Sequence, residues 1–218
     1  MAERVKPKRR YDSSRRREQA AATRREILAA AQRLFEAHGY AGTTMAAIAE
    51  EAGVAVKTVY LGFETKSNLL RMLWNARLRG DEDDIPVGQR HWYQEVIEEP
   101  DPERKLRLNA RNARNARERM GRLLGVIRSG GHGDADVAAL WNRIQTEFYE
   151  HQRRILETLP PKALRRGLDA DRAADILWTL NHPDVWLLLV DERDWTAEQW
   201  EEWFADISCA QLLNGRPE

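Results

Sequence analysis

Two consecutive residues, Lys57 and Thr58, have side chains with the chemistry needed to read the base edges of DNA. A lysine can donate hydrogen bonds to O6 and N7 of guanine in the major groove, and a threonine can contact a base or the methyl group of thymine. Val56, which precedes them, can also contact a thymine methyl group. The local pattern predicts that all three belong to one short helix over about residues 56–61, which Gly62 ends.

Two further residues are candidates for contacts with DNA phosphates. We predict that Thr44 is the N-cap of a helix and that Lys66 lies at the start of another. The free backbone N–H groups and the dipole at a helix N-terminus favour a bound anion, and Lys66 adds its own charge. Phosphate contacts would supply most of the affinity for DNA, whereas contacts with base edges would supply the sequence specificity.

The elements that must position these residues are three helices. Apolar residues recur with a helical period over residues 22–38, and Gly39 is expected to end this first helix. The second helix follows Thr44, and Gly53 supplies the next turn because glycine reaches positive φ without a steric penalty. Val59 would anchor the third helix. This order predicts a helix-turn-helix, which places its second helix in the major groove. The alternative is an ordinary three-helix packing unit with a glycine turn.

A resemblance to a known family rests on four segments of this region. They are T-R-R-E-I-L-A-A-A (23–31), L-F-E-A-H-G-Y (34–40), T-T-M-A-A-I-A-E-E-A-G-V (43–54) and T-V-Y-L-G-F-E-T-K-S-N-L-L (58–70). Together they resemble the tetracycline-repressor-like (TetR) family of transcriptional regulators. The resemblance implies an N-terminal three-helix helix-turn-helix DNA-binding domain and a C-terminal helical domain for ligand binding and dimerisation. No segment has a convincing strand pattern, so we expect an all-α fold of about nine helices.

The resemblance also assigns a role to one aromatic residue and leaves others in doubt. Tyr60 matches the family's aromatic residue near the phosphodiester, and its O–H can donate to a phosphate; the alternative is a packing role. The family often has serine at the N-cap of the recognition helix, where this chain has Ala55. It also frequently has histidine or tyrosine where Leu61 and Gly62 stand here, so one typical contact is expected to be missing.

Charge is unevenly distributed along a chain whose net charge is zero. Residues 1–80 hold 16 Lys and Arg against eight Asp and Glu, a net of +8, and residues 81–218 hold 19 against 27, a net of −8. This split indicates a polyanion-binding region joined to an acidic one. We expect a disordered basic arm over residues 1–22, a DNA-binding domain over 23–79 and an effector-binding and dimerisation domain over 80–218. Arg15, Arg16 and Arg17 of the arm would enter the minor groove, raise nonspecific affinity or form a solvated tail.

Several classes of protein fit the sequence poorly. The single cysteine, Cys209, excludes an internal disulfide, and the scattered histidines form no metal-ligand motif, so we expect no metal site and no cofactor. No group of nucleophilic or acid–base residues indicates an enzyme. The N-terminus lacks the apolar region of a signal peptide, and the longest apolar run, residues 185–190, is too short to span a membrane. These observations predict a cytoplasmic protein without a membrane partner.

The second half of the chain contains candidates for an effector pocket. Ligand pockets are mostly apolar and aromatic with a few polar groups, and tryptophans are frequent here. The candidate residues are Trp92, Trp141, Trp178, His182 and Trp186. We expect one helix over about residues 171–190, in which Pro183 removes a hydrogen bond. The alternative is that these tryptophans are ordinary core residues. The repeat N-A-R-N-A-R-N-A-R over residues 109–117 predicts a solvated surface or, alternatively, a polar wall of a pocket.

The end of the chain is predicted to form a dimer interface. Residues 185–190 are apolar on every side of a helix, and Thr196 with Gln199 forms the capping box of a last helix that has an apolar stripe. The candidate interface residues are Val185, Leu188, Leu189, Trp200, Trp203, Phe204 and Ile207. Two helices from each subunit would form a four-helix bundle with two-fold symmetry.

The sequence therefore favours a ligand-responsive transcriptional repressor that acts as a homodimer. It would bind a palindromic operator in double-stranded DNA and be released by a small apolar or aromatic effector. One alternative is an architectural DNA-binding protein without an effector. An all-α enzyme is the other, and the residues give it little support.

Overall fold

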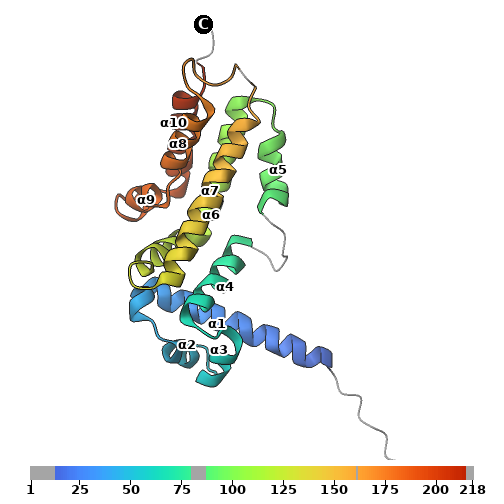
Figure 1. Ribbon diagram of the computed structural model, residues 1–218, viewed down its shortest axis with the longest axis vertical. Helices are drawn as coiled ribbons and strands as arrows, with labels where there is room; N and C mark the ends of the chain where they lie inside the picture. The colour runs from blue at the N-terminus through green and yellow to red at the C-terminus, as the bar shows by residue number, and fades with distance from the viewer. Residues whose placement is uncertain (1–12, 80–86, 161, 215–218) are drawn as a thin grey trace, which may run out of the picture.

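The computed structural model describes residues 13–79, 87–160 and 162–214. These residues are mainly helical. Within the described ranges there is no β-strand, and the β-type pairing is limited to one isolated bridge between Leu164 and Leu213. The all-α prediction is confirmed. The molecule is elongated: α1–α3 form one end, α6 and α7 run antiparallel through the middle, and α8–α10 cover one side of the other end (Figure 1). No helix within these ranges is both long and apolar enough to cross a bilayer.

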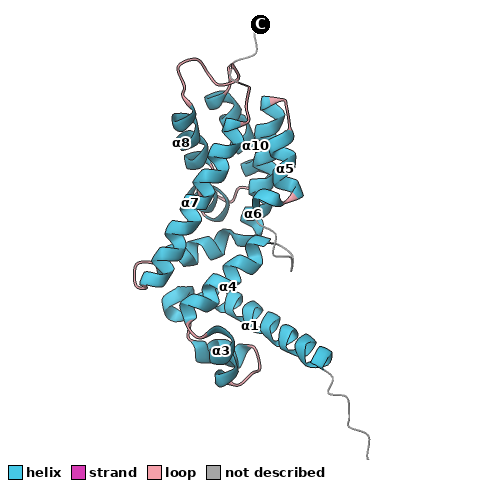
Figure 2. Ribbon diagram, turned by 45° about the vertical axis from the view of Figure 1, so that its right-hand side comes forward, coloured by secondary structure: helices cyan, strands magenta, loops and turns pink. Residues whose placement is uncertain are grey.

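Four helices form the N-terminal end of the molecule (Figure 2). They are α1 (Ser13–Gly42), α2 (Met45–Glu51), α3 (Val56–Phe63) and α4 (Lys66–Arg79). Helix α1 begins before residue 22, within the arm expected to be disordered. The residues concerned, S-S-R-R-R-E-Q-A-A-A, are mostly strong helix formers, which explains why the helix continues through them. The remainder of that arm, residues 1–12, lies outside the described residues.

Gly39 interrupts the first helix as predicted, with a φ of 70°, but α1 resumes and ends at Gly42. The other predicted caps and turns of this region are present, with one difference. Thr44 is the N-cap of α2, where its side chain accepts a hydrogen bond from Ala47 N–H. Gly53 has a φ of 64°, a value that glycine adopts without strain. Ala55 caps α3 without a side-chain hydrogen bond. The difference is at Gly62, which does not end α3, because the buried side chain of Phe63 holds one further residue in the helix.

The remaining helices form the larger part of the molecule. In chain order they are η1 (Val87–Gln89), α5 (His91–Glu98), α6 (Pro102–Gly130), α7 (Ala135–Glu157), α8 (Ala170–Leu180), α9 (Pro183–Trp186), the π-helix η2 (Leu187–Asp191) and α10 (Ala197–Leu212). The capping box of α10 forms as predicted between Thr196 and Gln199. Its N-cap bonds fix the start of the last helix.

The helix expected over residues 171–190 is divided by a corner into α8 on one side and the consecutive helices α9 and η2 on the other. Helix α8 ends at Leu180, and Asn181 is its C-cap. Pro183 then occupies the first turn of α9, where its missing N–H is not needed. The corner forms because a proline inside one continuous helix would remove a hydrogen bond and clash with the preceding turn.

One hydrophobic core joins the DNA-binding end to the rest of the molecule. It contains Phe35, Ile48 and Leu69 from the first four helices together with Leu123 and Val137 from α6 and α7. The predicted boundary near residue 80 therefore separates two stretches of sequence whose side chains pack together. Helices α6 and α7 therefore pack directly against the first four helices, α1 and α4 included.

Acid is expected to destabilise the α8–α9 corner through His182. Burial and the nearby guanidinium groups of Arg128 and Arg117 lower the pKa of His182 from 6.5 to about 4. The Nδ1 atom of His182 accepts a hydrogen bond from the backbone N–H of Asp184 at 3.3 Å, which requires the neutral ring. The unfolded chain takes up this proton at a higher pH than the folded chain. The contribution is therefore complete above pH 6.5 and is lost as the pH falls towards about 4.

We expect the free energy of unfolding to fall by about 2 kcal/mol through this group between neutral pH and about pH 4.5. Urea unfolding at a series of pH values measures it. In His182→Asn, the new side chain keeps an N-cap acceptor and does not titrate, so this part of the pH dependence should disappear. Parallel pH profiles for the two proteins would contradict the assignment.

Candidate DNA interface and effector cavity

The exposed side of α3 brings together most of the side chains predicted to contact DNA. They are Val56, Lys57, Thr58 and Tyr60. The side chains of Val56 and Tyr60 are 42% and 50% exposed, although valine and tyrosine commonly bury more of their surface. Val59 and Phe63, on the opposite side, are 0% and 1% exposed and fix α3 to the core. This arrangement presents a short, rigidly held helix whose outer side is free to enter a DNA groove.

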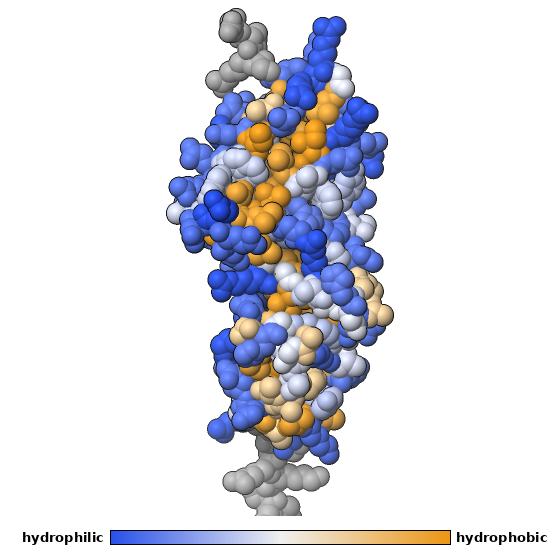
Figure 3. Space-filling view, turned by 90° about the vertical axis from the view of Figure 1, so that its left-hand side faces the viewer, coloured by the Kyte–Doolittle hydropathy of each residue, from blue (hydrophilic) through white to orange (hydrophobic). Residues whose placement is uncertain are grey.

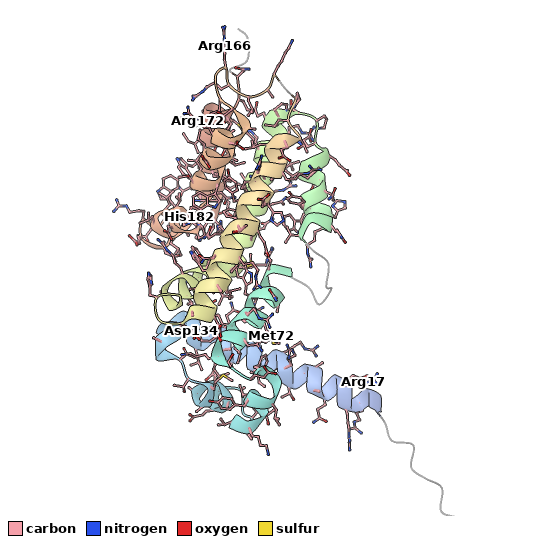
Figure 4. All side chains as sticks on the ribbon, in the orientation of Figure 1. Arg17, Met72, Asp134, Arg166, Arg172 and His182 are labelled. Carbon is pink, nitrogen blue, oxygen red and sulfur yellow. The ribbon has the colours of Figure 1, made fainter. Side chains whose placement is uncertain are left out.

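Two further residues predicted to contact DNA lie near the starts of α2 and α1. Thr44 is exposed at the start of α2, and its hydroxyl keeps a donor because the capping bond from Ala47 N–H uses it as an acceptor. Arg17 lies near the free end of α1, which projects away from α3 (Figure 4). Its position differs from that of a disordered arm, since Arg15, Arg16 and Arg17 all belong to the helix.

Lys66 is placed differently from the other predicted phosphate contacts. Its Nζ atom donates to the carbonyl oxygens of Tyr40 at 2.7 Å and Thr43 at 2.9 Å, and it lies 4.1 Å from the centroid of the Tyr40 ring. Burial lowers the pKa of Lys66. Two of the three ammonium donors are therefore used inside the protein, where they hold the α1–α2 connection against α4. At most one donor remains for a phosphate.

Hydrogen bonds between polar side chains also join the α1–α2 connection and α4 to the start of α7. The Tyr40 hydroxyl donates to Asp134 Oδ2 at 2.5 Å, and Asp134 is also the N-cap of α7 (Figure 4). Burial raises the pKa of Tyr40, with a further contribution from the bond to Asp134, and the same bond lowers the pKa of Asp134. Ser67 of α4 makes a second bond, to Asp136 Oδ2 at 3.2 Å. Gly130 allows the close approach, because a Cβ atom there would lie 2.9 Å from Tyr40 Cβ.

A cavity of about 120 Å³ lies among α4, α5, α6 and α7. Its apolar lining consists of Trp74, Leu78, Val87, Trp92, Tyr93, Ala113, Ala116, Met120, Leu124, Ile144, Phe148, Ile155 and Pro183. Its polar lining consists of Asn109, Asn112, Arg117, Gln145, Glu147, His151, Gln152 and Asn181. An apolar, aromatic wall with a few polar groups is typical of a small-molecule site. Trp74 and Leu78 belong to α4, so the cavity shares a helix with the DNA-binding end.

The structure separates the residues predicted for this pocket. Trp92 lines the cavity, whereas Trp141, Trp178, His182 and Trp186 are not among its described lining residues. The His182 ring lies 5.1 Å from Trp178 and 6.2 Å from Trp141, measured between ring centroids. Trp186 is buried and packs edge-on against another tryptophan, 5.0 Å away, in the core of the α8–α10 region. Trp141 and Trp178 therefore pack on His182 outside the described lining, and Trp186 belongs to a separate core.

Sequence reasoning missed several polar lining residues of the cavity because it treated their segment mainly as a surface. Asn109, Asn112 and Arg117 fall within the N-A-R repeat, and Ala113 and Ala116 lie between them. Counted from Asn109, the other four positions follow after three, four, seven and eight residues, so all five share one side of α6. The alternative interpretation, a polar pocket wall, describes this side of the helix. Arg111 lies on the exposed side and pairs with Glu95.

The predicted interface residues lie on the α8–α10 side at different depths. Leu188 is 51% exposed, and Val185, Leu189, Trp203 and Ile207 are half-buried. Trp200 and Phe204 are fully buried and stack on each other within the chain, so they support this side from beneath. Figure 3 shows apolar residues gathered in a band on the upper part of this face.

A helix-turn-helix with an exposed α3, joined to a helical body that surrounds an apolar cavity, defines the class of DNA-binding transcriptional regulators. The family model described as "Bacterial regulatory proteins, tetR family" matches residues 27–73. The chain is also 31% identical over 179 residues to the HTH-type transcriptional regulator TtgR of Pseudomonas putida, covering 78% of this chain and 82% of that protein. The chain belongs to the TetR family of bacterial transcriptional regulators. Members of this family are regulators, which confirms that the chain is not an enzyme.

Solved structures show the same fold. NalD, the secondary repressor of the MexAB-OprM multidrug efflux pump in Pseudomonas aeruginosa, is 22% identical, with a TM-score of 0.67 over 89% of this chain and 98% of that one. The SmeT–triclosan complex is 20% identical, with a TM-score of 0.69 over 89% of this chain and 93% of that one. At these identities the likeness establishes the shared fold.

Proposed function

We propose that this regulator is a repressor that binds a palindromic operator as a homodimer and leaves it when a small effector enters the cavity. The observation that most supports this function is the position of α4. This helix lines the cavity through Trp74 and Leu78, and its first turn binds the α1–α2 connection through Lys66. One helix thus touches both the site of the effector and the support of the DNA-binding surface.

The proposed dimer uses the α8–α10 side of the molecule. Half-buried and exposed apolar side chains gather there, and Leu188 is one of the large apolar residues that are more than half exposed in the described part of the chain. Exposed apolar patches on otherwise polar proteins mark sites of association. Two-fold pairing of α8 and α10 would bury this patch and set the distance between the two α3 helices. DNA half-sites for such dimers lie about 34–36 Å apart.

Induction is proposed to act as a population shift between two arrangements of α4. An effector that fits the cavity in only one arrangement favours that arrangement, by no more than its difference in affinity for the two. Movement of α4 would displace Lys66 and the α1–α2 connection, and the two α3 helices would no longer match the half-sites. The likeness to NalD, a repressor of a drug efflux pump, and to SmeT in its complex with triclosan supports an apolar effector here.

Selection of bound duplexes from random DNA tests the proposed function, with the purified full chain and sequencing of the recovered duplexes. We expect one enriched palindrome. The DNA-binding surface of a dimer requires this symmetry, and neighbouring genes would then indicate the physiological effector. Salt-sensitive binding without an enriched sequence would contradict the repressor and would favour an architectural DNA-binding protein.

A further inference from the structure

Arg117 of α6 is buried at the cavity wall without a carboxylate partner. Its side chain is 7% exposed, and its Nη2 atom donates to the backbone carbonyl of Asn181 at 2.5 Å and to the amide oxygen of the same residue at 3.4 Å. The guanidinium carbon also lies 5.1 Å from the centroid of the Phe148 ring. All these partners are neutral. A buried charge is ordinarily paired, because its removal from water is costly.

No described carboxylate compensates for this charge. Glu147 is the acidic residue among the described lining residues; it is exposed, and its charge acts on His151. Burial alone lowers the pKa of Arg117 to about 10, and no acidic residue opposes that shift. Within the described part of the chain, the buried guanidinium is therefore stabilised only by neutral partners.

Buried polar atoms of Arg117 and of the neighbouring lining residue Gln145 also lack partners. The Nε atom of Arg117 and both polar atoms of the Gln145 side chain are buried, and none has a hydrogen-bond partner among the described residues. Both residues line the cavity. Buried polar atoms without partners are uncommon in folded proteins and point to a bound ligand, water or ion. Here a hydrogen-bond acceptor in the cavity could accept from both Arg117 Nε and the Gln145 amide nitrogen.

The shape and lining of the cavity limit what the rest of such a ligand can be. Trp74, Trp92 and Phe148 supply aromatic surface, and Met120 and Ile144 supply aliphatic surface. An apolar cavity of roughly 150 Å³ accepts benzene, and this one measures about 120 Å³. The cavity is therefore of about the size of one aromatic ring.

We propose that the effector is an aromatic carboxylate whose anionic group pairs with Arg117 and whose ring occupies the apolar part of the cavity. This inference rests on the proposed function, since it specifies the chemistry of the effector. The carboxylate would accept from Nε or a free guanidinium N–H, and the Gln145 amide would donate to the same group. The electrostatic preference is for an anion, because a neutral ligand of equal shape leaves the buried cation unpaired.

Paired ligands test the proposal on the full chain at neutral pH. The probes are benzoate, phenylacetate and 2-naphthoate, each compared with its own amide, which has nearly the same shape without the charge. Tryptophan fluorescence reports binding because Trp74 and Trp92 line the cavity, and calorimetry provides a second readout. We expect at least one acid to bind about ten- to a hundredfold more tightly than its amide, the range for hydrogen bonds to charged groups. The proposal is overturned if no acid binds more tightly than its amide.

Two variants locate the preference. Arg117→Met should reduce the affinity for the acid to that of the amide while the amide is little affected, and Arg122→Met, which changes an exposed arginine of the same helix, should change neither. Circular dichroism confirms that each variant is folded. A preference for the acid that persists in Arg117→Met would overturn the assignment to this residue.

The operator obtained by selection separates this inference from the proposed function. Release of the operator by a neutral apolar compound, with no preference for acids, would overturn the inference and leave the repressor intact. Absence of any specific operator would contradict the repressor, whereas the comparison of acid with amide would still decide the chemistry of the cavity.

Discussion

Replacing Lys57 with alanine is expected to weaken operator binding by about 2–6 kcal/mol, or roughly thirtyfold to more than ten-thousandfold. Lys57 is exposed on α3, where it can donate to O6 and N7 of guanine. Loss of one such contact costs about 1–3 kcal/mol, and a dimer loses two. Fluorescence anisotropy on the selected operator, at one fixed salt concentration, measures the change.

The matched control for this substitution is Lys162→Ala. Lys162 is an exposed lysine of the connection between α7 and α8, a segment that lies at the opposite end of the molecule from α3 (Figure 1), so its loss should leave operator binding unchanged. A scrambled duplex of equal length distinguishes a base contact from a phosphate contact, since loss of a phosphate contact weakens both duplexes alike. Equal weakening on operator and scrambled DNA would show that Lys57 does not read a base.

Replacing Lys105 with methionine is expected to lower the free energy of unfolding by about 2–4 kcal/mol. The Lys105 side chain is 1% exposed, and its Nζ atom donates to the carbonyls of Val96 and Ile97 and to the Thr158 hydroxyl, at 3.0, 2.7 and 2.8 Å. Methionine has a similar length and no donor. It would leave the carbonyls at the end of α5 buried without partners. The substitution also removes the cost of burying the lysine charge, which only partly offsets the lost hydrogen bonds.

Urea unfolding compares this variant with Arg104→Met, which removes a neighbouring basic residue. The Arg104 side chain is 75% exposed and pairs with Glu99. Exposed ion pairs contribute about 0–1 kcal/mol, so Arg104→Met should unfold at nearly the same urea concentration as the wild type. If Lys105→Met were equally harmless, α5 would not depend on the lysine for its attachment to α6 and α7.

Local features of the fold were predictable because they depend on residues close together in the sequence. The cap at Thr44, the positive φ of Gly53 and the capping box of Thr196 with Gln199 all follow from neighbouring residues and are all present. The end of α3 was not predictable in this way, because the buried side chain of Phe63 decides it. The same holds for the corner at Pro183. The sequence indicates an interruption within one helix, whereas in the structure α8 ends at Leu180 and a new helix begins at Pro183.

The site was less predictable than the fold, and for a physical reason. Residues on α3 are identified by their own segment, since exposure there follows from the helical period around Val59. The cavity needs contributions from several helices, and its position depends on how they pack. The polarity of Arg117 suggests a surface residue, and only the tertiary contacts show that it is buried. Lys66 is the converse case, because its charge suggests DNA whereas its nearest acceptors are backbone carbonyls of Tyr40 and Thr43.

The bond between Tyr40 and Asp134 restricts how this regulator can be recombined with its relatives. An engineer who exchanged the first 79 residues for those of another member would remove Tyr40 and leave its partly buried acceptor, Asp134, behind. The graft would also need a residue at position 40 that tolerates the close approach of Gly130. Chimeric sensors built on this chain should therefore keep residues 40, 130 and 134 from a single parent, even though the exchange point that the sequence suggests lies between them.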